Sequence, residues 1–361
     1  MLEIRAFLRA AAVLSLLSCS NGAAVIDGGV PPATCTFRNP IDVGADPWVV
    51  REGGYYYLSE SRDNGIWVYK STSLTSLKQN AIKVWTAPPT GWNETNVWAP
   101  ELHHIGGLWY IYYAAGRRHA DGSDAPFTSQ RAGVLQSVAD DPQGAYVDKG
   151  MLYTGDNVQA QTGDVWAIDL TVGDINGQMY AVWSGWDQNN STTDRVQQNL
   201  YTARMSDPLT IATNRVKIAA PDASWERGPE LPLEEGPEFL EHGGQEFIIY
   251  SANDSWLPDY QLGQLQLTTP TADPLNPASY VKSGPVFSGT TGVYGVGHSS
   301  YTKSPDGTED WIVYHSKVDP SPGWNRVIRT QKFGWNANGS PNFGTPVATG
   351  ESIQMPAGQC K

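Results

Sequence analysis

Three carboxylic acids stand where the surrounding sequence gives them a chemical role. Asp46 directly precedes a proline, Asp169 lies in an apolar run, and Glu235 precedes Gly236 and Pro237, which fix a sharp turn. A carboxylate that is buried among apolar residues costs free energy unless it is paired or used. Two carboxyl groups that flank a glycosidic bond can hydrolyse it, because the protonated one assists the leaving oxygen while the ionised one activates water or attacks carbon. A third carboxylate supplies a like charge that keeps the acid protonated near neutral pH.

The three acids belong to a repeat that recurs five times. Each repeat begins with an ionisable residue, continues with a few strand-like residues and a glycine-containing turn, and ends in an aromatic and β-branched strand. This order is typical of a β-hairpin in which the turn glycines adopt positive φ. The repeats cover residues 44–61, 98–116, 166–186, 234–254 and 295–317, and the ionisable residues are Asp46, Glu101, Asp169, Glu235 and His298.

The spacing of the repeats predicts the fold. The five ionisable residues are separated by 55, 68, 66 and 63 positions, which leaves room for four short strands and their loops in each repeat. We therefore expect an all-β, single-domain protein that folds as a five-bladed β-propeller. Because the innermost strand of each blade lines the axis, all five residues would point into one funnel. A β-sandwich is the alternative, but it does not explain why an ionisable residue opens every repeat.

The composition agrees with short strands and narrows the class of partner. The chain has 37 Gly, 25 Pro, 14 Trp and 17 Tyr, and only 17% of its residues are charged, which argues against a helical bundle. The formal net charge of −13 disfavours nucleic acid and anionic membranes, because phosphates would be repelled. Many aromatic residues on an acidic background fit a neutral sugar, although most of these rings are expected in the core.

Five short motifs follow one another at the spacing of the repeats. Arg326 and the run Gln331-Lys332-Phe333-Gly334-Trp335 come after them. The motifs are Asp46-Pro47, Trp98-Ala99-Pro100-Glu101, Ile168-Asp169, Glu235-Gly236-Pro237 and Gly297-His298-Ser299. In this order they resemble glycoside hydrolase family 43, and the resemblance extends over essentially the whole chain after the N-terminal segment.

The resemblance implies a role for each of these positions in an inverting glycoside hydrolase. Asp46 would be the general base, Glu235 the general acid, and Asp169 the carboxylate that raises the pKa of the acid and orients it. Arg326 would contact substrate. His298 would face a water-coordinated ion on the propeller axis, often calcium in relatives, and no other cofactor is expected.

Neighbouring residues compete for three of these roles. Glu234 and Glu238 flank the proposed acid, and only the position relative to Gly-Pro favours Glu235. Arg329 competes with Arg326, but residues three apart on a strand face opposite sides, so only one can point inward. Glu101 is expected to be structural or to hydrogen-bond substrate.

Within the family, the sequence most resembles exo-acting α-L-arabinofuranosidases that trim α-1,5-linked arabinan. Ala45 stands where endo-arabinanases often have histidine, and the chain ends too soon after the fifth repeat for the C-terminal β-sandwich of many β-xylosidases. A β-xylosidase, an arabinoxylan arabinofuranohydrolase and a non-catalytic carbohydrate-binding propeller stay open as alternatives. The expected partner is plant cell-wall arabinan or arabinoxylan, bound by a monomer. Tryptophans that could form the pocket walls are Trp92, Trp98, Trp166, Trp186 and Trp256.

The two ends of the chain indicate secretion. Residues 1–24 contain two arginines and a short apolar run, which is typical of a signal peptide and too short to span a bilayer. The same run resembles a lipoprotein cleavage site at which Cys19 would be lipidated. After a short segment at residues 25–36, the catalytic domain is expected to occupy residues 37–361. Cys35 and Cys360 would form a disulfide in an extracellular protein.

Overall fold

Antiparallel β-sheets make up almost all of the regular structure in this computed structural model, which describes residues 35–360. The expected signal peptide and the lipidation of Cys19 lie outside the described residues, as does most of the segment 25–36. Within residues 35–360 the two helical segments are short 3₁₀ turns, η1 (Ser224–Glu226) and η2 (Pro277–Ser279). Accordingly, this part of the chain has no helix long and apolar enough to cross a membrane.

Five blade sheets follow one another, three with four strands and two with five. The first is β3 (Trp48–Glu52), β4 (Tyr55–Ser61), β5 (Gly65–Ser71) and β6 (Ile82–Thr86). The second is β7 (Thr95–Ile105), β8 (Leu108–Gly116), β9 (Arg131–Ser137) and β10 (Tyr146–Met151). The third is β11 (Ala167–Ile175), β12 (Gln178–Gly185), β13 (Asn199–Asp207) and β15 (Val216–Ala219), with the short β14 (Thr210–Ile211) paired to β13. The fourth is β16 (Glu234–His242), β17 (Gln245–Ala252), β18 (Gln261–Leu267) and β19 (Tyr280–Ser288). The fifth is β20 (Tyr294–Lys303), β21 (Asp310–Lys317), β22 (Arg326–Trp335) and β2 (Asp42–Val43), with β23 (Pro341–Asn342) paired to β22.

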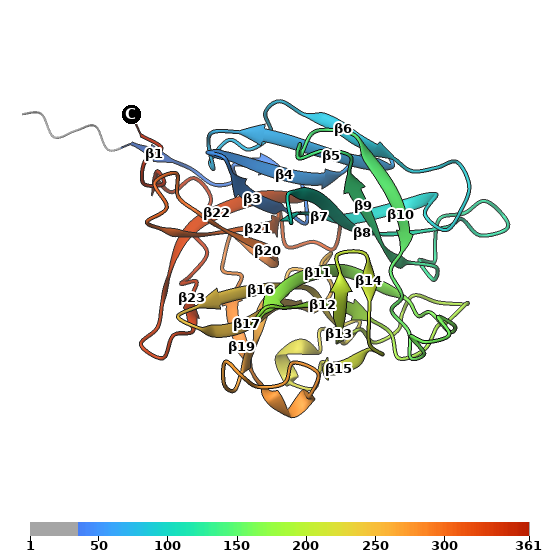
Figure 1. Cartoon of the computed structure of the whole chain (residues 1–361). Helices are drawn as coiled ribbons and strands as arrows, with labels where there is room; N and C mark the ends of the chain where they lie inside the picture. The colour runs from blue at the N-terminus through green and yellow to red at the C-terminus, as the bar shows by residue number, and fades with distance from the viewer. Residues whose placement is uncertain (1–34, 361) are drawn as a thin grey trace, which may run out of the picture. The chain divides into compact units, whose positions relative to one another are not determined.

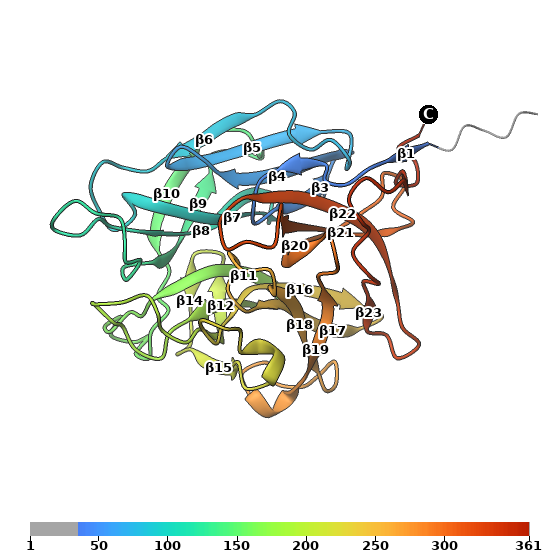
Figure 2. The same ribbon diagram turned by 180° about the vertical axis from the view of Figure 1, so that it is seen from behind.

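The five sheets are the blades of a β-propeller, as the repeats predict. The first two strands of every blade form the expected hairpin, with its turn at the predicted glycines. Each first strand (β3, β7, β11, β16 and β20) contacts the first strands of both neighbouring blades, so these five strands close a ring. Figures 1 and 2 show them around the centre, with the later strands of each blade farther out.

The hydrophobic core is divided among the interfaces between blades. Side chains alternate between the two faces of a strand, so each blade offers one apolar set to the preceding blade and another to the next. In β8, for example, Tyr110 and Tyr112 pack toward the third blade, whereas Trp109, Ile111 and Tyr113 pack toward the first. Five main buried clusters, one per interface, therefore hold the ring together.

The ring closes through residues at the N-terminus of the described chain. Strand β2 forms the outer edge of the fifth blade by pairing with β22, and the chain then crosses directly into the first blade. Just before β2, the buried side chain of Asn39 hydrogen-bonds both the carbonyl oxygen and the N–H of Thr330. Strand β1 (Thr36–Phe37) pairs with β24 (Ile353–Gln354), and Cys35 is disulfide-bonded to Cys360, which confirms the predicted pairing.

In each blade one residue near the axis is in the left-handed region, within the innermost strand of four blades and two residues before β3 in the first blade. Four of these five residues lie at a register shift, where a β-bulge interrupts the pairing of the first two strands. The left-handed residues are Asp46 (φ 48°), Ala99 (41°), Asp169 (53°), Gly236 (53°) and His298 (44°). These five residues occupy equivalent positions in the blades, so the predicted alignment of the repeats is wrong in two of them. Glu101 lies two residues after the equivalent position in the second blade, and Glu235 lies one residue before it in the fourth.

Candidate active site

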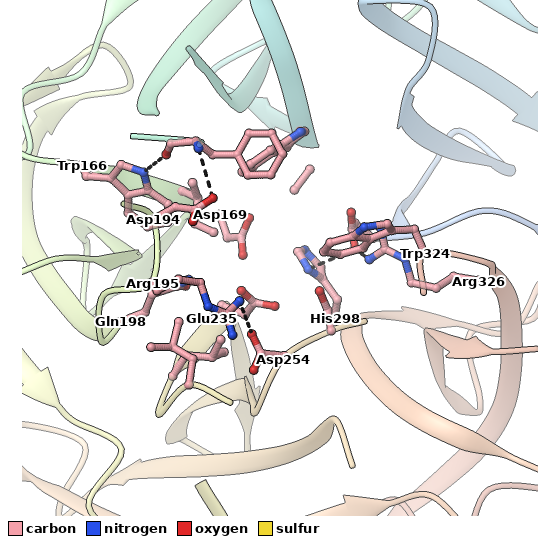
Figure 3. Close-up of a pocket in the computed structure, with 18 residues that line it drawn as sticks. Trp166, Asp169, Asp194, Arg195, Gln198, Glu235, Asp254, His298, Trp324 and Arg326 are labelled. Carbon is pink, nitrogen blue, oxygen red and sulfur yellow. Dashed lines mark hydrogen bonds and ion pairs between the residues drawn. The ribbon is translucent and has the colours of Figure 1, made fainter. Parts of the chain in front are cut away.

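A pocket of about 330 Å³ lies where the five blades meet. Every blade contributes to its wall, and three of the five left-handed residues (Asp46, Asp169 and His298) bring ionisable side chains into it. Figure 3 draws the lining residues as sticks and labels ten of them, with Asp169, Glu235 and Asp254 on one side and His298, Trp324 and Arg326 on the other. The full lining consists of Asp46, Trp98, Ala99, Phe127, Trp166, Ile168, Asp169, Asp194, Arg195, Gln198, Leu231, Leu233, Glu235, Asp254, Ser255, His298, Trp324 and Arg326.

Asp46 is surrounded by nitrogen atoms. Its Oδ1 lies 2.9 Å from Nη1 of Arg326 and 3.4 Å from Nδ1 of His298. The backbone N–H of Asp46 donates to Nδ1 of His315 at 3.2 Å, and burial lowers the pKa of His315 to about 4, so this ring is neutral at neutral pH. Burial of Asp46 opposes ionisation, but Arg326 and the two imidazoles outweigh it and hold the pKa of Asp46 well below its usual range. Asp46 is therefore ionised under ordinary conditions.

Glu235 has the opposite environment. Its side chain is buried, and the negative charges of Asp169 and Asp46 add to the effect of burial, so the pKa of Glu235 is well above its usual range. Tyr260 offsets part of this shift. Glu235 therefore stays protonated at pH values where an exposed glutamate has lost its proton.

Asp169 is joined to Glu235 through the backbone. Its Oδ2 accepts the N–H of Gly236 at 3.0 Å, which fixes the residue next to Glu235. Burial, strengthened by the charge of Asp46, raises the pKa of Asp169, while His298 and the Gly236 N–H act against the increase. The third carboxyl thus both positions Glu235 and disfavours its ionisation.

The competing residues lie outside the pocket. Glu234 is buried with its Oε1 2.7 Å from Nζ of Lys282, and Glu238 is buried beside Glu101. Arg329 points away from the axis, where its Nε donates to Ser316 Oγ at 2.7 Å. Arg326, by contrast, is the lining residue, as expected from the three-residue spacing.

Glu101 is not part of the pocket wall, contrary to the expectation that it points into the same funnel. Its Oε2 lies 3.0 Å from Nε2 of His103, and its side chain is paired with that of Glu238. Burial raises the pKa of Glu101 and Glu238 well above the usual range, so the pair retains at least one proton. In the second blade the bulge residue that lines the pocket is Ala99, and Glu101 comes two residues later in the strand.

Two of the five candidate tryptophans line the pocket. Trp98 packs edge-on against Phe127, and the indole N–H of Trp166 donates to the Phe127 carbonyl at 2.7 Å. Trp186 is fully buried and stacks behind Trp166 with ring centroids 4.4 Å apart, so the expectation that Trp186 contacts sugar is not supported by its position. Trp92 and Trp256 are not lining residues either.

Much of the remaining wall comes from loops that sequence reasoning missed. Phe127, Asp194, Arg195, Asp254 and Trp324 all lie between strands, and no motif marked them, although Asp254 is the last residue of the fourth repeat. Asp194 and Asp254 are two further carboxyl groups of the pocket, and burial raises the pKa of Asp254 to about 6. The only available signal was the position of Trp324 two residues before Arg326.

The described side chains do not by themselves form a metal site. Residues 35–360 contain no group of three or more His, Cys, Asp and Glu side chains arranged to hold an ion. The Nδ1 of His298 lies 3.4 Å from Oδ1 of Asp46. The expected axial ion would approach His298 only through water, and this contact stays a proposal.

Comparisons with known proteins agree with the geometry. The sequence profile described as glycosyl hydrolases family 43 matches residues 37–341. The chain is 36% identical to an extracellular exo-α-(1→5)-L-arabinofuranosidase of Streptomyces avermitilis, over 97% of this chain and 71% of that protein. It is 31% identical to a protein of the same name from Streptomyces chartreusis, over 87% of this chain and 91% of that protein. The crystal structure of an α-L-arabinofuranosidase from Lactobacillus brevis superimposes with a TM-score of 0.76 at 30% identity, covering 87% of this chain and 98% of that one. The propeller and its axial carboxyl groups therefore belong to a glycoside hydrolase, and the chain is a member of glycosyl hydrolases family 43.

Proposed function

We propose that this protein is an inverting, exo-acting α-L-arabinofuranosidase that releases terminal arabinose from α-1,5-linked arabinan. The observation that carries the proposal is that two carboxyl groups in one pocket have opposite surroundings: Asp46 lies 2.9 Å from Arg326, which lowers its pKa, whereas Glu235 is buried near Asp169, which raises its pKa. This division is the one that acid–base hydrolysis of a glycosidic bond requires. The choice of sugar and linkage is supported by the names of the two Streptomyces relatives.

The chemical step follows from these two groups. Asp46 takes a proton from a water molecule as the water oxygen bonds to the anomeric carbon. The bond to the leaving oxygen breaks on the opposite face, and Glu235 donates its proton to that oxygen. Asp46 ends protonated and Glu235 ionised, and exchange with solvent restores both. Because one displacement occurs, the configuration at the anomeric carbon is inverted.

The shape of the site supports release of single residues from a chain end. All five blades contribute to the wall, so the lining surrounds the axis rather than following one side of a long groove. A volume of about 330 Å³ is at the small end of ligand pockets. Such a pocket accepts a terminal residue, and the rest of the polymer stays outside.

The proposal includes an extracellular location and a plant cell-wall substrate. The Streptomyces relatives are named extracellular, and the Cys35–Cys360 disulfide fits an oxidising compartment. The monomeric state stays a prediction.

Product analysis tests the function. The enzyme is incubated with linear α-1,5-arabinan, with branched arabinan, with an aryl α-L-arabinofuranoside and with an aryl β-xyloside. We expect arabinose alone from linear arabinan and no xylose. A ladder of oligosaccharides would indicate an endo-acting enzyme, and xylose release would indicate a β-xylosidase.

The same experiment includes the variant Glu235→Ala, which removes the proposed acid. It should fold normally and lose arabinose release by at least a thousandfold, because an alkoxide is a poor leaving group without protonation. A folded Glu235→Ala variant that works at nearly the wild-type rate would contradict the role of Glu235.

A further inference from the structure

A large aromatic side chain stands exposed at the edge of the pocket. Trp324 is 62% exposed although it lines the pocket, and it lies in the loop between β21 and β22. A single exposed hydrophobic residue is ordinary and needs no explanation by itself. Trp324 differs from other exposed hydrophobic residues in its contacts and in its location.

The Trp324 ring is held in place from behind. Its indole stacks against that of Trp256, with ring centroids 6.1 Å apart and planes 28° apart. The N–H of Gly323 donates to the carbonyl of Trp256 at 2.9 Å, and Nζ of Lys317 donates to the carbonyl of Gly323 at 2.5 Å. The stacking on Trp256 and the two hydrogen bonds of Gly323 hold this loop in place, so that Trp324 presents a pre-ordered face to solvent.

The same ring is joined to the catalytic centre. The guanidinium carbon of Arg326 lies 5.4 Å from the centre of the Trp324 indole, and Arg326 donates to Asp46. Trp324 is therefore next to the reaction site rather than on a distant surface.

Only two residues that line the pocket are strongly exposed, and they differ in chemistry. Arg195 is paired with Glu230 at 2.6 Å and lies 3.8 Å from Asp254, whereas Trp324 offers an apolar face. Figure 3 shows the two on opposite sides of the pocket. When a terminal sugar occupies the pocket, the next sugar must lie at these exposed edges.

We propose that Trp324, supported by Trp256, forms a binding site for the sugar ring that follows the scissile bond, by stacking on the C–H face of that ring. The inference rests on the exo-acting function proposed above, because only an exo-acting enzyme leaves the rest of the chain at the mouth. The ligand is a neutral pentose unit of an oligosaccharide. Its stacking on the indole stabilises substrates of two or more sugars and gives nothing to a substrate that has one sugar.

Two substrates with the same kind of leaving group test the site. Methyl α-L-arabinofuranoside has no second ring, whereas α-1,5-arabinotriose does, and both release an alkoxide oxygen that needs the same protonation. We measure kcat/KM on both substrates for the wild type, Trp324→Ala, Trp324→Phe and Tyr55→Ala. Tyr55 is 38% exposed at the start of β4 and is not a pocket residue, so Tyr55→Ala controls for the loss of an exposed aromatic ring.

Trp324→Ala should lower kcat/KM on arabinotriose about tenfold more than on the methyl glycoside, because only arabinotriose has a second ring to stack. Trp324→Phe should retain most of the wild-type value on arabinotriose, and Tyr55→Ala should match the wild type on both substrates. Equal losses on both substrates would overturn the proposal, because Trp324 would then act on Arg326 and Asp46. An unchanged value on arabinotriose would also overturn it. Failure of the wild type to hydrolyse either substrate would instead refute the proposed function.

Discussion

Asp46 and Glu235 differ in protonation because burial dominates at Glu235, whereas Arg326 and the neighbouring imidazoles outweigh burial at Asp46. Asp46 is beside a guanidinium group and two imidazole rings, whereas Glu235 is buried with two other carboxyl groups. Neither residue's immediate sequence neighbours supply these charges. The protonation states therefore belong to the assembled ring of blades, and each is open to test by changing one partner.

The pH dependence of the reaction tests the contribution of Arg326. The acidic limb of kcat/KM reports protonation of the base, and Arg326 lowers the pKa of Asp46. Arg326→Leu should raise that pKa, so the acidic limb should move to higher pH by about 1 unit or more. Arg326→Lys should move it less, since the positive charge is kept.

The alkaline limb provides the internal control in these profiles. It reports loss of the proton from Glu235, whose pKa is raised mainly by burial, with the carboxylates adding to it. The limb should therefore stay in place in Arg326→Lys. An acidic limb that is unmoved in Arg326→Leu would show that Arg326 does not set the ionisation of Asp46.

At the scale of the strand, the left-handed residues near the axis place the site. A bulge with positive φ redirects the chain, so the side chain at that position faces the pocket instead of an interface between blades. The fourth blade uses Gly236 there. A Cβ atom on Gly236 would lie 3.1 Å from Nδ1 and 3.2 Å from Cγ of His298, which contacts Asp46.

Gly236→Ala should consequently reduce kcat/KM tenfold or more, because the added methyl group displaces His298. The control is Gly243→Ala in the same blade, where φ is also positive (59°) but no heavy atom lies within 4 Å of the added Cβ. Both variants should lose about 1 kcal/mol of stability from backbone strain. Equal activity in the two variants, measured with equal folded fractions, would contradict a role for this close approach.

The hairpins could be predicted from sequence, but the exact position of each bulge could not. Glycine turns and alternating apolar residues are local features, and all five predicted hairpins are confirmed. The repeat predicts that Glu101, the ionisable residue, points into the funnel, but the bulge residue that lines the pocket is Ala99. A bulge shifts the side-chain alternation by one residue, and Ala99 carries no chemical signal that would reveal it.

The positions of the tryptophans and of the loop residues could not be predicted from the sequence either. Trp186 is one of the tryptophans expected in the pocket wall, but its ring is fully buried and stacks on Trp166. Trp324 and Arg195 lie on loops, and their positions depend on contacts with other blades. Such contacts join residues far apart in the chain, so a single sequence does not encode them in a local pattern.

The whole molecule depends on closing the ring between the fifth and first blades. Asp46 lies in the short crossover between β2 and β3, directly after the strand that completes the fifth blade. The disulfide between Cys35 and Cys360, 325 positions apart, fixes the chain just outside this closure. The ring closure and the catalytic base therefore lie in the same segment of the chain.

Removing the disulfide should destabilise the fold without changing the chemistry. Replacing both cysteines by serine should lower the free energy of unfolding by about 2–5 kcal/mol and the melting temperature by roughly 4–10 °C. The value of kcat/KM at 25 °C should stay within twofold of the wild type. Reductant should lower the melting temperature of the wild type and leave that of the double variant unchanged, and a double variant as stable as the wild type would contradict the closure argument.

The central claim is that Asp46 and Glu235 together hydrolyse a terminal arabinofuranoside in one displacement. Proton NMR of the first product formed from α-1,5-arabinotriose, recorded before mutarotation, tests this claim most directly. We predict that the released arabinose appears first as the β-anomer and that arabinobiose accumulates beside it. Initial appearance of the α-anomer would contradict the account, because it requires a covalent intermediate and a different role for Asp46.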